Sequence, residues 1–269
     1  MPKPDLVALT GGYRRIPVLQ IGADIFCDTN LIAAVLEHLH PARSLYPGER
    51  RAETAVWCSW AERVFMWPTA RYMTALNDHD LGGAAFRADR AAMRGHAAPT
   101  HDEIMAALPH NREQCQIMLG WLDGVLADGR RFLLGHEPGL ADFAVYQRVW
   151  WLHALSGKAA DVARNFEHLL SWTTRVRAIG HGSRRELSVV DAGRIAAGSS
   201  DARLRLGTPI AYPRVGARIS IGTEDHAPDV LTGAVVSSTT ESIAIAPASG
   251  HYGTTVHFPR LGFRWDVLG

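Results

Sequence analysis

Apolar residues recur with two different periods along the 269-residue chain, and the changes of period divide it into three regions. Two short apolar runs, 16–20 and 25–27, flank a glycine-containing turn, which predicts a β-hairpin. From Leu31 the apolar positions follow helical spacing, and this pattern recurs as far as Ile195. After Pro209 the composition shifts to Val, Ile, Thr and Ser between turn residues, which predicts a small antiparallel barrel or sandwich.

The helical region carries its own start and stop signals. Capping boxes at Thr100 to Glu103 and Ser183 to Glu186 predict the starts of a second long helix and of the last helix. Pro68 should kink or end the first long helix. The apolar face of that first helix contains Trp57, Trp60, Ala61, Val64 and Phe65. Its tryptophans, with Trp67 and Tyr72, are expected in the core, with the wall of an apolar pocket as the alternative.

Composition and charge narrow the classes of function. The formal net charge is +1 and 20% of residues are charged, so no long-range field favours nucleic acid or an anionic membrane. No apolar run reaches membrane-spanning length. The three cysteines are widely spaced, which fits a reducing, cytoplasmic location. The histidine pairs 38/40 and 96/101 lack the spacing of metal ligands, so we expect no metal site.

The hairpin and the helix after it hold the candidate chemistry. Pro17 near a strand start is expected at a sheet edge, because proline gives the ladder no N–H. Asp28 and Thr29 offer side-chain oxygens to the free amides of the next helix, and such a helix start suits a carboxylate. Arg15 is a solvated charge or a partner for a ligand carboxylate. Cys27 is expected to be inert core rather than a nucleophile.

This arrangement resembles the second half of the thioredoxin-like domain of glutathione transferases. The resemblance implies that Ile16-Pro17 enters its strand with a cis peptide bond and that the backbone of Ile16 pairs with the cysteinyl part of glutathione. It also implies that Asp28-Thr29 holds the γ-glutamyl end, with Arg15 as a further contact. Glutathione would be a co-substrate, and the helical region would hold a hydrophobic electrophile.

A second motif resembles the same family. In Gly135-His-Glu-Pro-Gly-Leu-Ala-Asp142-Phe143 the aspartate opens the central helix, as in the family, but Gly139 replaces the capping hydroxyl three residues earlier. The segment 166–180 resembles the family's penultimate helix. The resemblance covers roughly residues 5–197 in order, and it does not include the β-rich tail.

We therefore expect an α+β protein with an incomplete thioredoxin-like βα unit at 1–42, an all-α transferase domain at 43–198 and a small antiparallel β domain at 207–269. The tail is open to three interpretations: a cap on the sheet, a dimer contact or a separate binding module. A thioredoxin-like domain needs a β-α-β unit before the hairpin. We expect a late start codon or a truncation, rather than a partner that covers the exposed edge.

The resemblance implies a transferase that ionises the glutathione thiol and conjugates it to an electrophile. The family's thiol-activating residue lies in the first strand or helix, so no catalytic residue is assigned, and weak binding and poor conjugation are expected of these 269 residues. The alternative is a non-enzymatic binding or assembly protein. A glutathione-dependent peroxidase or reductase would share the site. A two-fold homodimer is compatible with the family.

Overall fold

The computed structural model describes residues 3–154, 160–199, 204–225, 230–249 and 252–269. By its internal contacts the chain divides into two compact units. A sheet unit combines 1–41, 89–97 and 184–269, and a helical unit combines 42–88 and 98–183. The expected boundary at 42 lies at a division between the units, whereas the division expected at 198 lies at 183/184, so residues 184–198, expected in the helical domain, belong to the sheet unit together with the two ends of the chain.

Strands from both ends of the chain form one sheet. Within the described residues the strand order is β1-β2-β6-β5-β4-β3-β7, and every neighbouring pair is antiparallel except β2 with β6. The strands are β1 (Val18–Ile21), β2 (Asp24–Cys27), β3 (Arg218–Thr223), β4 (Val230–Ser238), β5 (Ser242–Pro247), β6 (Thr255–Pro259) and β7 (Phe263–Val267). The tail therefore extends the sheet of the hairpin, and the expectation of a separate β domain at 207–269 is corrected.

The pairing of β2 with β6 changes the interpretation of the hairpin's exposed edge. β6 supplies the ladder partner for β2, so the chain's own tail covers that side of the hairpin, and β1 is the outermost strand. The tail also covers the helix that follows, because Leu206 packs with Leu31 and Val35. Sequence reasoning missed this arrangement because the strands that pair are more than 200 residues apart.

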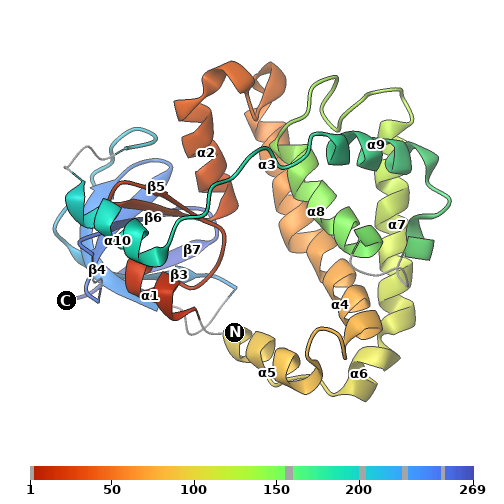
Figure 1. Cartoon of the computed structure of the whole chain (residues 1–269), viewed down its shortest axis with the longest axis horizontal. Coiled ribbons are helices and arrows are strands. Elements are labelled where there is room, and N and C mark those ends of the chain that lie inside the picture. Colours follow the sequence, from red (N-terminus) through yellow and green to blue (C-terminus); the bar gives the residue numbers. More distant parts are fainter. Residues whose placement is uncertain (1–2, 155–159, 200–203, 226–229, 250–251) are drawn as a thin grey trace. The chain divides into compact units, whose positions relative to one another are not determined.

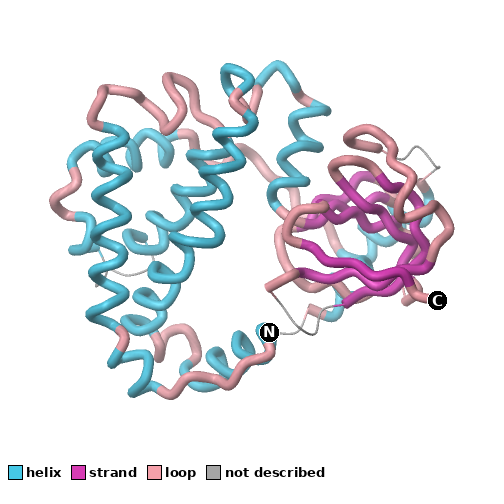
Figure 2. Tube along the Cα trace, turned by 180° about the vertical axis from the view of Figure 1, so that it is seen from behind, coloured by secondary structure: helices cyan, strands magenta, loops and turns pink. Residues whose placement is uncertain are grey.

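Alternation along β2 sends side chains to both faces of the sheet. Ile25 and Cys27 join a core made with the tail strands, and Phe26 faces α2 (Thr29–Leu39) on the other side. The core also takes in Leu9 of α1 (Pro4–Thr10) and Tyr13. α1 and α10 (Val189–Gly198) lie in front of the strands in Figure 1, and the strands lie in front in the reverse view of Figure 2.

A buried hydrogen bond between side chains joins β2 to β6. Asp24 Oδ1 lies 2.7 Å from Nε2 of His257, and both side chains are almost fully buried. The imidazole also stacks on Phe26, with ring centroids 4.4 Å apart. Burying an unpaired carboxylate is costly, so the pair favours the placement of β6 beside the hairpin.

The last helix begins later than its sequence predicts. The expected capping box at Ser183 to Glu186 lies in extended chain, and α10 starts after Ser188, whose hydroxyl accepts from the amide of Asp191 at 3.1 Å. Both segments have a hydroxyl three residues before an acid, but only the second precedes a buried face. Gly193 on that face lies so close to Tyr252 that a Cβ atom there would be 2.5 Å from its ring.

The helical unit surrounds a core that centres on α7 and α8. Trp172, Leu119, Leu122, Val145 and Leu152 are fully buried there. Its helices are α3 (Arg51–Ser59), η3 (Trp60–Phe65), α4 (Met66–Asn77), α6 (His101–Ala106), α7 (Leu108–Leu126), α8 (Leu140–Ala154) and α9 (Glu167–Ala178), and α5 (Gly83–Arg94) belongs in part to each unit. No helix in the described part of the chain is both long and apolar enough to cross a bilayer.

Pro68 does not end the first long helix. A π-helical segment, Trp60–Phe65, precedes it, and α4 then continues to Asn77. A proline removes an amide donor and crowds the carbonyl four residues earlier, and the wider π turn just before it relieves that crowding. The predicted face is largely correct, since Ala61 and Phe65 are fully buried, but Val64 is 47% exposed.

Asp142 holds the start of the central helix with no help from a capping hydroxyl. Its carboxylate accepts from the amides of Leu133 (2.8 Å) and Gly139 (3.0 Å) and from the indole N–H of Trp172 (2.8 Å). Burial raises the pKa of this carboxyl, and the three donors act in the opposite direction. Gly139 is explained by close packing: a Cβ atom there would lie 2.8 Å from Cδ of Pro47.

Candidate functional site

The hairpin brings the two candidate pairs to the same end of the sheet. Val18 pairs with Cys27 in the antiparallel ladder, so Ile16-Pro17 and Asp28-Thr29 continue from that pair on adjacent strands. The peptide bond between Ile16 and Pro17 is cis, as the family resemblance implies. Ile16 is 65% exposed and Thr29 is also exposed, so a ligand has access to both.

Asp28 has the backbone geometry of a constrained position. Its φ of 75° and ψ of 136° lie in a region that non-glycine residues seldom adopt, and its side chain accepts from the amide of Asn30 at 2.9 Å. Such a conformation persists only where the surrounding structure imposes it, and strained residues cluster at functional sites. Burial raises the pKa of the Asp28 carboxyl, opposed by the Asn30 amide and by the charge of Arg15.

Arg15 has a partner that the sequence does not reveal. Its two Nη atoms lie 3.1 and 3.4 Å from the two carboxylate oxygens of Asp225 in a bidentate pair. Asp225 follows β3, which joins the hairpin's sheet only through β4, β5 and β6, so no local pattern links it to Arg15. Arg15 thus keeps contact with solvent but is also paired with a carboxylate, and its role towards a ligand stays a prediction.

Two further polar groups lie beneath this end of the hairpin. Cys27 is fully buried, and burial raises the pKa of its thiol well above the ordinary value. Tyr13 is 3% exposed, packs edge-on against Phe258, and has a phenol whose pKa burial also raises strongly. Both groups stay protonated at neutral pH, so Cys27 is core, as expected, and neither supplies a reactive anion.

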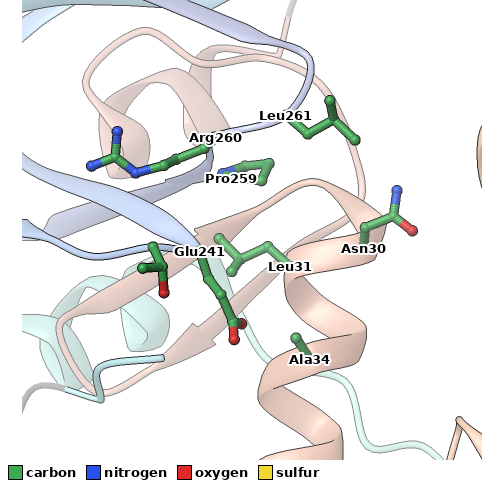
Figure 3. A pocket seen from close by; sticks show the side chains of 8 residues that line it. Asn30, Leu31, Ala34, Glu241, Pro259, Arg260 and Leu261 are labelled. Atoms are coloured by element: carbon green, nitrogen blue, oxygen red, sulfur yellow. The ribbon is translucent and has the colours of Figure 1, made fainter. Parts of the chain in front are cut away.

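A separate hollow of about 300 Å³ lies beside the first turn of α2. Leu31 and Ala34 on one side and Pro259 and Leu261 on the other give it a largely apolar lining (Figure 3). Arg260 lines it too, but its guanidinium binds the carbonyl of Thr239 and the hydroxyl of Ser238. The hollow offers no charged group of the α2 start to a ligand, so we do not treat it as the site.

The sequence therefore predicts the candidate groups of the hairpin but not Asp225, the partner of Arg15. Among the described residues no group of three His, Cys, Asp or Glu side chains is placed to hold a metal ion.

Comparisons with known proteins show the family to which the chain belongs. The profile of the glutathione S-transferase C-terminal domain matches residues 84–179. A glutathione S-transferase-like protein from Pseudomonas syringae is 30% identical, and the similarity covers 100% of this chain and 87% of that chain with a TM-score of 0.80. The chain therefore belongs to the glutathione S-transferase family.

More distant structures resemble smaller parts of the chain. A glutathione S-transferase from Rhodospirillum rubrum is 18% identical over 76% of this chain and 80% of that chain, with a TM-score of 0.48. A family member from Pseudomonas fluorescens, determined with two glutathione molecules bound, is 17% identical over 57% of this chain and 60% of that chain, with a TM-score of 0.43. The search of curated proteins found no match.

Proposed function

We propose that the sheet unit binds glutathione along Ile16-Pro17 and at the start of α2. The observation that carries the proposal is the placement of Ile16-Pro17 and Asp28-Thr29 at one end of the hairpin, with Ile16 exposed. The N-terminal end of α2 and the Thr29 hydroxyl suit the carboxylate of the γ-glutamyl group. The exposed backbone ahead of Pro17 suits the peptide part of glutathione.

The reaction proposed is the one typical of the family, in which the glutathione thiolate attacks an electrophilic small molecule. A free thiol has a pKa near ~8.5, so a donor must stabilise the thiolate at neutral pH. Tyr13 and Cys27 are buried in the core of the sheet unit and are closed to a ligand, so we assign that role to neither of them. The partly buried tryptophans Trp57 and Trp60 of the helical unit are our candidates for contact with the electrophile.

The second candidate function is glutathione binding without conjugation. The burial of Tyr13 and Cys27 favours it, because neither side chain is open to a ligand thiol. A cytoplasmic location and a two-fold dimer are part of the same proposal, by analogy with the family. Glutathione-dependent peroxidase or reductase activity would use the same binding groups.

Isothermal titration of the full chain with glutathione tests the binding proposal. Asp28→Asn and Thr29→Val should each lower the affinity, by about tenfold for a lost charge-assisted hydrogen bond. Asp128→Asn, an exposed carboxylate of the helical unit, is the matched control and should leave the affinity unchanged. Circular dichroism verifies that each variant is folded. Absence of glutathione binding by the folded wild type would refute the proposal.

A conjugation assay with 1-chloro-2,4-dinitrobenzene then separates the two functions. Binding together with turnover that saturates in glutathione supports the transferase. Binding without turnover supports the non-enzymatic function.

A further inference from the structure

The tail contributes a charged residue to the proposed glutathione site. Asp225 holds Arg15 by two hydrogen bonds of 3.1 and 3.4 Å, and the two side chains are 47% and 33% exposed. Arg15 directly precedes Ile16-Pro17 in the chain. The tail strand β3 therefore ends close to the residues that would contact the ligand, although more than 200 residues separate the two segments.

Asp28 belongs to the same charged group. Burial raises the pKa of the Asp28 carboxyl, the charge of Arg15 acts in the opposite direction, and the charge of Asp225 adds to the rise. Both carboxylates therefore lie within electrostatic reach of each other and of one guanidinium. With all three groups ionised, this end of the site has a net charge of −1.

Two carboxylates and one guanidinium attract a ligand's ammonium group more than its carboxylate. A ligand that ends in a carboxylate alone meets an arginine whose two Nη atoms already bind a carboxylate, and it adds a third negative charge. A ligand whose carboxylate is accompanied by an ammonium group brings a positive charge to a group that holds two carboxylates and one guanidinium. The mutual repulsion of Asp28 and Asp225 is then reduced, while the ligand carboxylate is left to the amides at the start of α2.

We propose that Asp225 is a specificity residue of the site, which selects ligands with an amino-acid head group by attracting their ammonium group. The inference rests on the proposed function, because it assumes that the γ-glutamyl end of glutathione lies near Asp28 and Thr29. The β-rich tail then does more than complete the sheet. It adds a negative charge to the end of the hairpin that carries Ile16-Pro17 and Asp28-Thr29.

Two ligands and two variants of the full chain test the proposal. Glutathione and glutaryl-cysteinylglycine differ only by the α-amino group. The wild type should bind glutathione more tightly. Asp225→Asn should weaken glutathione binding by about fivefold, the effect of a partly exposed ion pair, and leave binding of the deamino ligand unchanged or tighter. Glu224→Gln makes the same change of charge at the exposed neighbour and should alter neither affinity.

The outcomes separate this inference from the function on which it rests. Equal weakening of both ligands by Asp225→Asn means that Asp225 only holds Arg15, which overturns the inference and leaves the glutathione site intact. No change with either ligand also overturns it. A folded wild type that binds neither ligand overturns both proposals.

Discussion

The interactions that stabilise each unit internally differ in their range along the sequence. The helical unit is made of two stretches, 42–88 and 98–183, and its core follows helical spacing within each. The sheet unit takes β1 and β2 from one end of the chain and β3 to β7 from the other. The contrast shows that one chain can combine a region of local order with a region whose strands must meet across more than 200 residues.

Two buried carboxylates, Asp142 of the helical unit and Asp24 of the sheet unit, reflect this difference. Asp142 accepts three N–H groups and organises a helix start together with the neighbouring loop and helix. Asp24 binds a single imidazole, that of His257, and joins the two ends of the chain. Removal of the Asp142 carboxylate therefore tests contacts within the helical unit, and removal of the His257 imidazole tests the pairing of the two ends of the chain.

The largest expected effect is at Asp142. Asp142→Ala leaves the N–H groups of Leu133, Gly139 and Trp172 buried without an acceptor, so the helical unit should lose about 3–5 kcal/mol of unfolding free energy. Urea unfolding followed by circular dichroism at 222 nm measures this. The exposed Asp128→Ala is the control, and a loss at Asp142 below about 1 kcal/mol would contradict the assignment.

The second largest effect on stability is expected where β2 pairs with β6. His257→Ala leaves Asp24 buried and unpaired, which should cost the sheet unit about 2–4 kcal/mol and raise hydrogen exchange in β2 and β6. The double variant Asp24→Val, His257→Ala removes the buried charge and should recover part of the loss. His168→Ala, an exposed histidine of the helical unit, is the control. Equal losses in the single and double variants would show that the pair does not hold the strands together.

The sequence separation of the contacting residues explains which parts of this fold can be predicted from the sequence. Helical spacing, the capping box at Thr100 and the glycine stop at Gly180 are local signals, and the structure confirms each. The hairpin and the expected cis bond at Pro17 are local as well. The break at Ala107 between α6 and α7 was missed, although Pro109 in the first turn of α7 gives a reason for it.

The parts that sequence reasoning missed depend on distant partners. No pattern near residue 24 indicates that β2 pairs with β6, and none near Arg15 points to Asp225. The late start of α10 has the same origin, since Ser183 and Ser188 both offer a cap and only packing against Tyr252 distinguishes them. Local pattern therefore predicts the candidate residues of the hairpin but not Asp225, the partner of Arg15.

The third effect concerns one glycine in each unit. Gly139→Ser restores the hydroxyl of the family's motif, yet its Cβ atom would lie 2.8 Å from Pro47 Cδ and 3.0 Å from the carbonyl oxygen of Leu45. Gly193→Ala places a methyl group 2.5 Å from the Tyr252 ring. Each should destabilise its own unit by about 1–3 kcal/mol, as overpacking does, in urea unfolding.

Matched variants give the glycine prediction its control. Gly193→Ala combined with Tyr252→Ala removes the clash and should be more stable than Gly193→Ala alone. Gly124→Ala lies in α7 with no atom within 4 Å of the added methyl, and it should stabilise by about 0.5–1 kcal/mol through helix propensity. A stable Gly139→Ser variant would show that the loop at Pro47 moves freely.

The smallest effect is at a helix cap of the helical unit. The Thr100 hydroxyl accepts from the amide of Glu103 at 3.2 Å, and the Glu103 carboxylate accepts from the Thr100 amide at 2.7 Å. Thr100→Ala should therefore cost about 1 kcal/mol at pH 7, comparable to Ser188→Ala at the start of α10. Urea unfolding of the two variants, followed in each unit by hydrogen exchange, compares the caps.

The pH dependence of the Thr100 cap has a defined sign. The hydrogen bonds from the Thr100 amide and hydroxyl lower the pKa of Glu103, so its stabilising contribution is present above the ordinary glutamate pKa of about 4.3 and is lost as pH falls through the lower folded value. The Thr100→Ala variant lacks the hydroxyl, so protonation of Glu103 lowers its stability by less than that of the wild type. The stability gap between wild type and variant should therefore narrow from pH 7 to pH 3. A gap that is constant over this range would mean that Glu103 does not share in the cap.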